Sequence, residues 1–357
     1  MKHEIYLYGM VTKTNGFLLR GDFPRADHYC EVKQRYTLPG GETGTAAIVL
    51  AALGCSVKVD GNYLGRYTKD LTLDFYEKIG VDVSALTYEA EYDGMDEFVM
   101  VDSTTRTNFS TFAAFHADYW ERGLCRWNTP NEKDIRTAKV AGLDAFFGKE
   151  STLAAEYCHK NNVPYVTIDE RPDNAVVKNA SIVAVSTEFI RDHMPEYYTE
   201  NERAGKVKLI KRFGEFTNAL IILTGGGGTT YYGRGGEVHE INAYKVNVVS
   251  TLGAGDTFKA GCVYALLHGY DDERTVRFAS ALAAVACTRF PLGLNPPRLE
   301  EVERLMANGI LGMGRGFSHE RIRQIRGNKK PRNLRINGHG NGFCRGRIYP
   351  SRGTHVL

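Results

Sequence analysis

The stretch of sequence that decides the fold is VVSTLGAGDTFKAGCVYALLHG, residues 248–269. A strand-like run ends at Ser250 and Thr251, the motif Gly253-Ala254-Gly255-Asp256 follows, and a helical pattern begins there. The two glycines allow a tight turn that points successive backbone N–H groups into one concavity. Because a helix N-terminus adds a positive partial charge, the motif predicts a binding site for an anion.

Asp256 stands beside the predicted anion site. A carboxylate there can accept the proton of an attacking hydroxyl, and the anion that suits the site best is a transferring phosphoryl group. The alternative is that Asp256 only caps the helix. The neighbouring glycines favour catalysis, which makes Gly253, Ala254, Gly255 and Asp256 the candidate catalytic residues.

Strand-like and helix-like segments alternate along the chain before and after this motif. Strand-like runs occupy residues 4–9, 138–142, 164–168, 182–185 and 219–224. Helical patterns occupy residues 44–53, 66–79, 150–162, 200–213, 255–268, 272–288 and 298–307. Repeated βα units predict a mainly parallel sheet covered by helices on both faces, with ligands bound beyond the carboxyl ends of the strands.

Two β-rich stretches, residues 16–38 and 95–115, interrupt this alternation. Within the second stretch, residues 97–101 and 107–112 predict a hairpin around a polar turn. We expect the two stretches to form a small sheet that projects from the main domain. A small sheet at the mouth of an α/β site can act as a lid.

A second motif, PGGETGTAA at residues 39–47, lies about 200 residues before the first and runs on to Leu53-Gly54. Together, this motif and GAGDTF at the start of a helix resemble the two signatures of the PfkB-type carbohydrate kinases, in the ribokinase-like superfamily. The resemblance spans roughly residues 4–307. It implies a ribokinase-like three-layer α/β/α sandwich with a mainly parallel sheet, plus a small β-sheet lid that often mediates homodimers.

The resemblance also implies ATP and Mg²⁺, and phosphorylation of a sugar or nucleoside hydroxyl. It assigns Asp256 as the general base and the N–H groups of residues 253–255 as the anion hole. For the nucleotide it points to Thr224, Gly226, Gly228, Thr251 and Ser186. The alternative for residues 225–228 is a plain glycine hairpin. Glu188 is the candidate that would organise Mg²⁺ through water, or else it is a solvated carboxylate at a helix start.

For the acceptor, the resemblance points to the first signature and to an early strand. Gly40 and Gly41 would let the backbone approach the substrate closely, and Thr45 stands where the family usually has asparagine. The usual early aspartate aligns near Thr14 or Asn15. Arg106 in the predicted hairpin and Asp144 after a strand are further candidate substrate contacts, or else ordinary surface residues. If the substrate carried a phosphate, the candidate ligands would be Lys13, Arg20, Lys33 and Arg35.

Other departures from the family pattern leave alternatives open. Ser250 replaces an acidic residue that often helps to hold a monovalent cation, so a requirement for that ion is undecided. A sugar kinase is the leading hypothesis. A nucleoside kinase would need an aromatic shelf, for which the sequence offers Phe109, Phe112 and Phe115. A non-catalytic relative that only binds nucleotide or sugar is the third hypothesis, although the retained Asp256 opposes it.

The composition is that of an ordinary soluble globular protein, with 43% hydrophobic and 24% charged residues. No apolar run reaches the length of a membrane span, and the first ten residues carry no secretory pattern. Seven scattered cysteines without a CxxC pair argue against a disulfide framework and a structural zinc site. We therefore expect a cytoplasmic protein without a membrane partner.

The last segment, residues 315–357, differs from the rest of the chain because it is rich in Arg and Gly and has almost no apolar periodicity. We expect it to be a disordered tail, or a segment foreign to the native product. Nucleic acid is the weaker alternative as a partner, because the tail lacks interleaved aromatic residues. The predicted domains are thus a kinase domain, residues 1–314, with lid segments at about 16–38 and 95–115, followed by this tail.

Overall fold

The structure is a computed structural model that describes residues 3–112 and 126–311. Its main sheet has the strand order β12-β11-β10-β9-β8-β7-β1-β4. The strands are β1 (Ile5–Gly9), β4 (Val57–Gly61), β7 (Val140–Leu143), β8 (Tyr165–Ile168), β9 (Ile182–Ser186), β10 (Leu220–Thr224), β11 (Thr229–Gly233) and β12 (His239–Asn242). Neighbours from β10 to β4 run parallel, whereas β11 and β12 are antiparallel.

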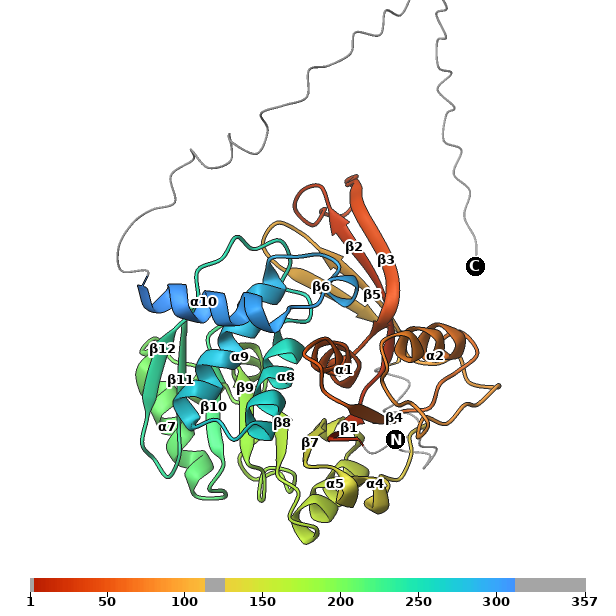
Figure 1. Cartoon of the computed structure of the whole chain (residues 1–357). Helices are drawn as coiled ribbons and strands as arrows, with labels where there is room; N and C mark the ends of the chain where they lie inside the picture. The colour runs from red at the N-terminus through yellow and green to blue at the C-terminus, as the bar shows by residue number, and fades with distance from the viewer. Residues whose placement is uncertain (1–2, 113–125, 312–357) are drawn as a thin grey trace, which may run out of the picture. The chain divides into compact units, whose positions relative to one another are not determined.

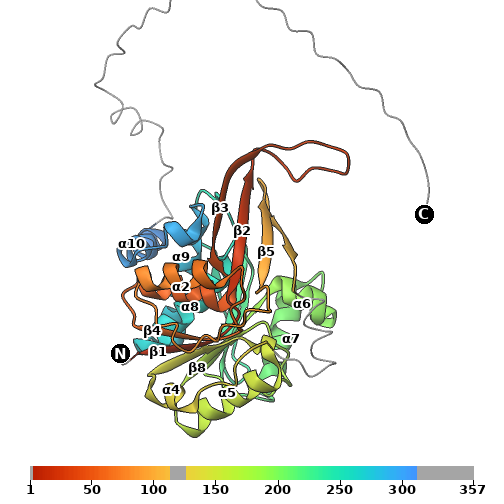
Figure 2. The same ribbon diagram turned by 90° about the vertical axis from the view of Figure 1, so that its right-hand side faces the viewer.

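Helices cover both faces of this sheet, and Figure 2 shows the resulting layers. One face carries α1 (Glu42–Ala52), α2 (Lys69–Lys78), α8 (Ala254–Leu267), α9 (Asp272–Cys287) and α10 (Leu299–Leu311). The other carries α4 (Glu132–Thr137), α5 (Lys149–Lys160), α6 (Thr187–His193) and α7 (Glu202–Gly214). Strand β1 explains this arrangement, because Ile5 and Leu7 enter one core while Tyr6 and Tyr8 enter the other. The prediction of a three-layer α/β/α sandwich is confirmed.

A second sheet, of order β3-β2-β5-β6, rises from the main sheet beside α1 (Figure 1). Its strands are β2 (Thr12–Leu19), β3 (Val32–Gly40), β5 (Asp96–Val101) and β6 (Arg106–Ser110). Strands β5 and β6 form the predicted antiparallel hairpin, and β5 runs parallel to β2 with Glu97 opposite Thr14. The small sheet therefore joins the two β-rich stretches, as the sequence predicts.

The glycine run after β10 forms the turn of a hairpin. The N–H of Gly228 donates to the carbonyl of Gly225 at 2.9 Å, and the chain returns as β11. This is the geometry that the alternative interpretation of residues 225–228 predicts. The C-terminal segment 315–357 and Phe115 lie outside the described residues.

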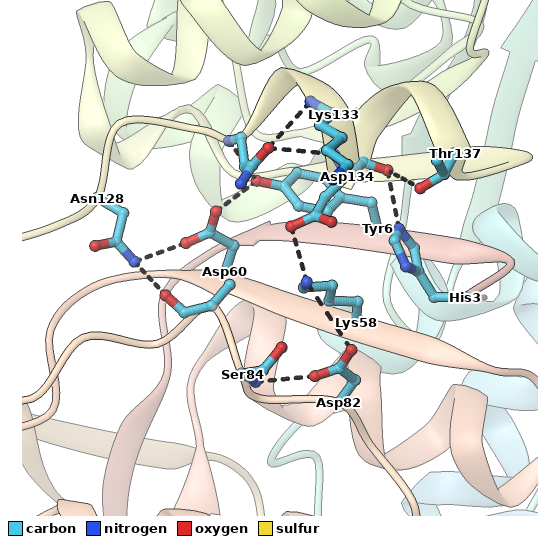
Figure 3. A network of polar contacts seen from close by, with 12 residues as sticks. His3, Tyr6, Lys58, Asp60, Asp82, Ser84, Asn128, Lys133, Asp134 and Thr137 are labelled. Atoms are coloured by element: carbon cyan, nitrogen blue, oxygen red, sulfur yellow. Dashed lines mark hydrogen bonds and ion pairs between the residues drawn. The ribbon is translucent and has the colours of Figure 1, made fainter. Parts of the chain in front are cut away.

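A polar network fastens the start of α4 to β1 and β4 (Figure 3). Tyr6 Oη donates to Asp60 Oδ2 at 2.7 Å, and Asn128 Nδ2 donates to Asp60 Oδ1 at 2.8 Å. Lys58 Nζ lies 2.8 Å from Asp134 Oδ2. Because protein donors satisfy both oxygens of Asp60, we read this network as structural.

Candidate active site

A cavity of about 430 Å³ lies at the carboxyl ends of the parallel strands, with the small sheet as one wall. Its lining comes from segments far apart in the sequence: Met10, Thr14, Gly40–Glu42, Thr45, Glu97, Arg106, Asn108, Asp169, Ser186, Glu188 and the start of α8. This is the edge of an open α/β sheet where ligands are expected. The two signature motifs of the sequence therefore meet in one cavity.

The turn before α8 has the geometry predicted for an anion site. Gly253 adopts φ 78°, in the left-handed region, and the N–H of Thr257 donates to its carbonyl at 2.9 Å. The N–H of Ala254 closes the turn onto the carbonyl of Thr251 at 3.2 Å. The N–H groups of Gly253 and Gly255, which both line the cavity, are therefore better placed for an anion than that of Ala254.

Close packing explains why residue 253 is glycine. A Cβ there would lie 2.8 Å from Leu292 Cδ2 and 3.3 Å from Thr45 Cγ2. Thr45, on α1, thus lies against the turn that carries Asp256. The first and second signatures are in contact through this pair.

Asp256 lies in the first turn of α8 and lines the cavity. Burial raises its pKa to about 8, and the negative charges of Glu42, Glu97 and Asp169 add to this increase. The guanidinium of Arg106 acts in the opposite direction. A carboxyl group with a pKa near neutral can hold a proton and release it again, which suits a general base.

The end of the cavity that carries the predicted acceptor residues depends on a close approach of two backbone segments. Gly41 has φ 80°, and a Cβ there would lie 2.7 Å from the carbonyl oxygen of Met10. The same carbonyl accepts the N–H groups of Thr43 and Gly44, both at 3.1 Å. A Cβ on Gly40 would lie 2.1 Å from Thr14 Oγ1. Both glycines are therefore required where the end of β3 and the start of α1 pass the corner between β1 and β2.

Asp144 does not face the cavity, which contradicts its prediction as a substrate contact. The residue is fully buried and forms an ion pair with Lys259 of α8. Its Oδ2 accepts the N–H of Met10 at 2.8 Å and the hydroxyl of Thr43 at 2.9 Å. With its acceptors engaged inside the fold, Asp144 ties together the segments that form the cavity walls instead of binding a ligand.

The other predicted acceptor residues divide into two groups. Thr14, Gly40, Gly41, Thr45 and Arg106 line the cavity. Asn15 does not, because its side chain donates to Asp96 Oδ1 at 2.6 Å. Arg106 Nη2 lies 3.8 Å from Glu188 Oε2, so the predicted metal residue pairs with the lid across the cavity mouth.

The predicted nucleotide residues are only partly brought together. Ser186 lines the cavity, and its N–H donates to Asp169 Oδ1 at 2.7 Å. Thr224 is its register partner on β10, but the lining residues do not include Thr224, Gly226, Gly228 or Thr251. Ser250 Oγ accepts the N–H of Leu252 at 3.1 Å and so shapes the turn before α8. The structure describes no group of three or more His, Cys, Asp or Glu residues that could hold a metal ion.

The residues proposed as a nucleoside shelf lie elsewhere. Phe109 is 47% exposed and stacks on Phe23 with ring centroids 6.3 Å apart. Phe112 is buried in the core on the α5 and α7 side of the main sheet. Neither residue lines the cavity.

Four charged residues were missed by sequence reasoning, or lacked a role. Glu42 and Glu97 line the cavity, and burial is the first cause that raises the pKa of Glu42. Lys259 is buried in the ion pair with Asp144, and burial lowers its pKa to about 8. Lys206 on α7 is buried and donates to Thr187 Oγ1, at the start of α6, at 2.8 Å. Only the glutamate inside the strand-like run 97–101 gave a signal, because a charge is unusual in such a run.

The comparisons with known proteins agree with this geometry. The family model described as pfkB family carbohydrate kinase matches residues 21–297. The chain belongs to this family. The assignment confirms the prediction of a carbohydrate kinase, an enzyme class that uses ATP.

Among curated relatives, this kinase is similar to proteins named 5-dehydro-2-deoxygluconokinase. The protein from Bacillus subtilis is 28% identical over 286 residues, which cover 75% of this chain and 86% of the relative. The protein from Listeria monocytogenes serotype 4a is 27% identical over 295 residues, with the same coverage of both chains.

Solved structures show the same fold. The ribokinase of Arabidopsis thaliana, complexed with ribose and ATP, matches with TM-score 0.67 and 18% identity, and covers 86% of this chain and 99% of its own. The ribokinase of Thermotoga maritima matches with TM-score 0.66 and 20% identity, and covers 86% of this chain and all of its own. The ribokinase-like fold is therefore confirmed. Within the described residues, no helix is both long and apolar enough to cross a membrane.

Proposed function

We propose that this kinase transfers the γ-phosphoryl group of ATP to a hydroxyl of a small sugar or sugar derivative, with Asp256 as the general base. One observation carries the proposal: Asp256, with a pKa raised to about 8, lies beside the free N–H groups at the start of α8. The names of the curated relatives and the positions of Phe109 and Phe112 favour a sugar over a nucleoside.

The proposed reaction is an in-line displacement. The acceptor hydroxyl gives its proton to Asp256 as its oxygen forms a bond to the γ-phosphorus. The bond between that phosphorus and the β,γ-bridging oxygen breaks, and ADP leaves. The N–H groups of Gly253 and Gly255, with the dipole of α8, stabilise the charge on the equatorial oxygens.

Arg106 is the basic residue that we assign to the transferred group. It is the cation whose charge lowers the pKa of Asp256, which indicates that it lies near the position where the phosphoryl group would pass. It belongs to β6 of the small sheet, so closure of that sheet would bring its charge onto the phosphate. Removal of this charge would lower kcat more than it raises KM.

The residues present also fit a magnesium ion of the kind that accompanies ATP. Mg²⁺ commonly uses one or two carboxylates, water and the phosphates themselves, so no dedicated protein cage is needed. Glu188 and Asp169 line the cavity and are the carboxylates that would hold it, directly or through water. When bound, the ion neutralises phosphate charge.

We also propose that the kinase forms a homodimer through the small sheet. Phe98 and Phe109 are paired across β5 and β6, and both are exposed, at 38% and 47%. A partner would cover these rings. Sedimentation of the Phe98→Glu/Phe109→Glu variant should show a monomer where the wild type is a dimer, and an unchanged mass would refute this interface.

The test of the function is ATP turnover, measured as coupled ADP release, across sugars, sugar acids, amino sugars and nucleosides. Asp256→Asn should lower kcat by about 10³-fold or more while ATP still binds. Asp272→Asn, which neutralises a half-buried aspartate in the first turn of α9 that pairs with Arg234 outside the cavity lining, is the control and should keep wild-type activity. Equal turnover by Asp256→Asn would show that another group is the base.

A further inference from the structure

The acceptor end of the cavity carries carboxylates that the sequence motifs did not predict. Glu97 on β5 is only 7% exposed and lines the cavity. Its Oε1 accepts the hydroxyls of Thr12 at 2.8 Å and Thr14 at 2.5 Å, and its Oε2 accepts Asn108 Nδ2 at 2.7 Å. These donors fix the carboxylate in place. Because each carboxylate oxygen has two lone pairs, Oε2 retains one for a ligand.

Glu42 supplies a second carboxylate from the neighbouring wall. It is the first residue of α1, directly after Gly41, and it lines the same cavity. With Asp256 it places three acidic side chains around the space between the small sheet and the start of α8. A group bound there meets carboxyl groups from β5, α1 and α8.

The basic residues of the small sheet do not balance these charges. Lys13 Nζ lies 2.8 Å from Asp96 Oδ2, and Arg20 Nε lies 2.9 Å from Glu31 Oε2. Lys33 and Arg35 lie on the exposed part of β3. None of the four lines the cavity, so the structure does not place the ligands expected for a phosphorylated substrate around it.

Among the described lining residues, the basic ones are Arg106 and His193. Arg106 pairs with Glu188 at 3.8 Å. His193 packs on Phe189 on α6, with ring centroids 4.6 Å apart. Arg106 serves the transferred phosphoryl group in the proposed mechanism, so no Lys or Arg among the described lining residues is left for an anionic acceptor.

The charge of the acceptor therefore decides whether it fits. Hydroxyl groups of a ligand donate hydrogen bonds to Glu97 and Glu42 and so replace the water molecules that these two side chains lose when the ligand binds. An ammonium group does the same and is also attracted. A carboxylate or phosphate would meet the acceptor oxygens of Glu97, and the raised pKa values of Glu42 and Asp256 show that this part of the cavity disfavours negative charge.

We infer that this kinase selects an uncharged or amine-bearing polyol as its acceptor and excludes sugar acids and sugar phosphates, with Glu97 and Glu42 as the residues that determine this choice. The inference rests on the proposed function and goes beyond it. It also separates this chain from the curated relatives, whose name describes the phosphorylation of a sugar acid.

The experiment compares acceptors that share a carbon skeleton and carry different charges. Two matched sets suit it: ribose, ribonate and ribose 5-phosphate; and glucose, glucosamine, gluconate and glucose 6-phosphate. Affinity is measured by calorimetry with a non-hydrolysable ATP analogue bound, and kcat/KM by ADP release. We expect the neutral or aminated member of at least one set to exceed its acid and its phosphate by about 100-fold or more in both measurements.

Two variants test the assignment to residues. Glu97→Gln and Glu42→Gln should each lower the ratio of kcat/KM for the neutral sugar to kcat/KM for its acid by about tenfold. Asp96→Asn is the matched control, because it removes a charge from the adjacent position of β5 without changing the cavity lining, and the preference should stay as in the wild type. Circular dichroism establishes that each variant is folded. A narrowed preference in one folded glutamate variant is enough to support the assignment.

The outcomes separate the inference from the proposed function. Binding or turnover of a sugar acid or phosphate as strong as that of its neutral partner overturns the inference and leaves the kinase intact. A preference that is unchanged in both folded glutamate variants overturns the assignment to these residues. Charge-selective binding without any turnover supports the inference and contradicts the proposed function.

Discussion

The ion pair between Lys259 and Asp144 gives the sharpest test of how the active site is held together. Lys259 lies three residues after Asp256 on α8, and both partners of the pair are fully buried. Through Asp144 the pair reaches the N–H of Met10 and the hydroxyl of Thr43. Replacement of Lys259 by Met should therefore affect both the stability of the fold and the position of the base.

The magnitude follows from what remains after the change. Removal of one partner of a buried ion pair leaves an uncompensated charge and costs about 3–5 kcal/mol. Asp144 keeps its bonds to Met10 and Thr43, so we expect the lower end, about 3 kcal/mol. A double variant, Lys259→Met with Asp144→Asn, removes both charges and should recover about 1–2 kcal/mol relative to Lys259→Met alone.

The assay is urea unfolding of the wild type, both single variants and the double variant, together with steady-state kinetics. Arg277→Met is the control, because Arg277 forms an exposed pair with Glu273 on α9 and should lose less than about 1 kcal/mol. We expect kcat of Lys259→Met to fall by about tenfold or more, because α8 loses its link to the start of α1. A loss of stability no larger than that of the control, or a double variant as unstable as the sum of the single ones, would refute the reasoning.

Three further predictions test other parts of the site and the fold. Because the pKa of Asp256 is raised to about 8 and the base must be ionised, kcat/KM should fall about tenfold per pH unit below that value; a flat profile from about pH 6 to 9 would contradict this. Gly253→Ala should lower kcat by about tenfold or more, because the added Cβ crowds the turn before α8. Gly54 is the control, because it has a similar φ of 86° but no atom within 4 Å of an added Cβ, so Gly54→Ala should cost only backbone strain of about 1–2 kcal/mol in unfolding experiments. Equal kcat in both variants would show that crowding at the turn is irrelevant. Tyr6→Phe removes the donor to buried Asp60 and should lower the free energy of unfolding by about 1–3 kcal/mol with kcat unchanged; a neutral effect would show that water replaces the hydroxyl.

Much of the fold could be predicted because its signals are local. The strand-like run at residues 219–224 and the helical pattern at 255–268 match β10 and α8 to within one residue at either end. The small sheet was also predicted, from two stretches that lack helical periodicity. Strands β4 and β12 were missed, because short strands that contain Gly, Lys or His carry little pattern of their own. Their pairing partners determine them.

The site was predictable where backbone geometry requires a particular residue type. Gly41 and Gly253 both adopt a positive φ and would crowd a neighbour if substituted, so only glycine fits there and the motifs can be recognised in the sequence. Asp144 shows the limit of this reasoning. A polar residue after a parallel strand is expected to face the ligand, yet Asp144 forms a buried ion pair with Lys259 on α8. Sequence position places the aspartate at the right edge of the sheet but does not state which neighbour it meets.

Glu97 places a carboxylate in the cavity from a strand that belongs to neither sequence motif. The usual early aspartate of the family was expected near Thr14 or Asn15 on β2, and the hydroxyl of Thr14 donates to the carboxylate of Glu97 on the adjacent strand. The two residues are 83 positions apart in the sequence and become partners only through the parallel register of β2 and β5. The absence of an aspartate at Thr14, taken alone, suggests a weakened acceptor site. Once the register is known, the negative charge is present in the same cavity, so the departures in the motif argue for a changed acceptor and not for a lost activity.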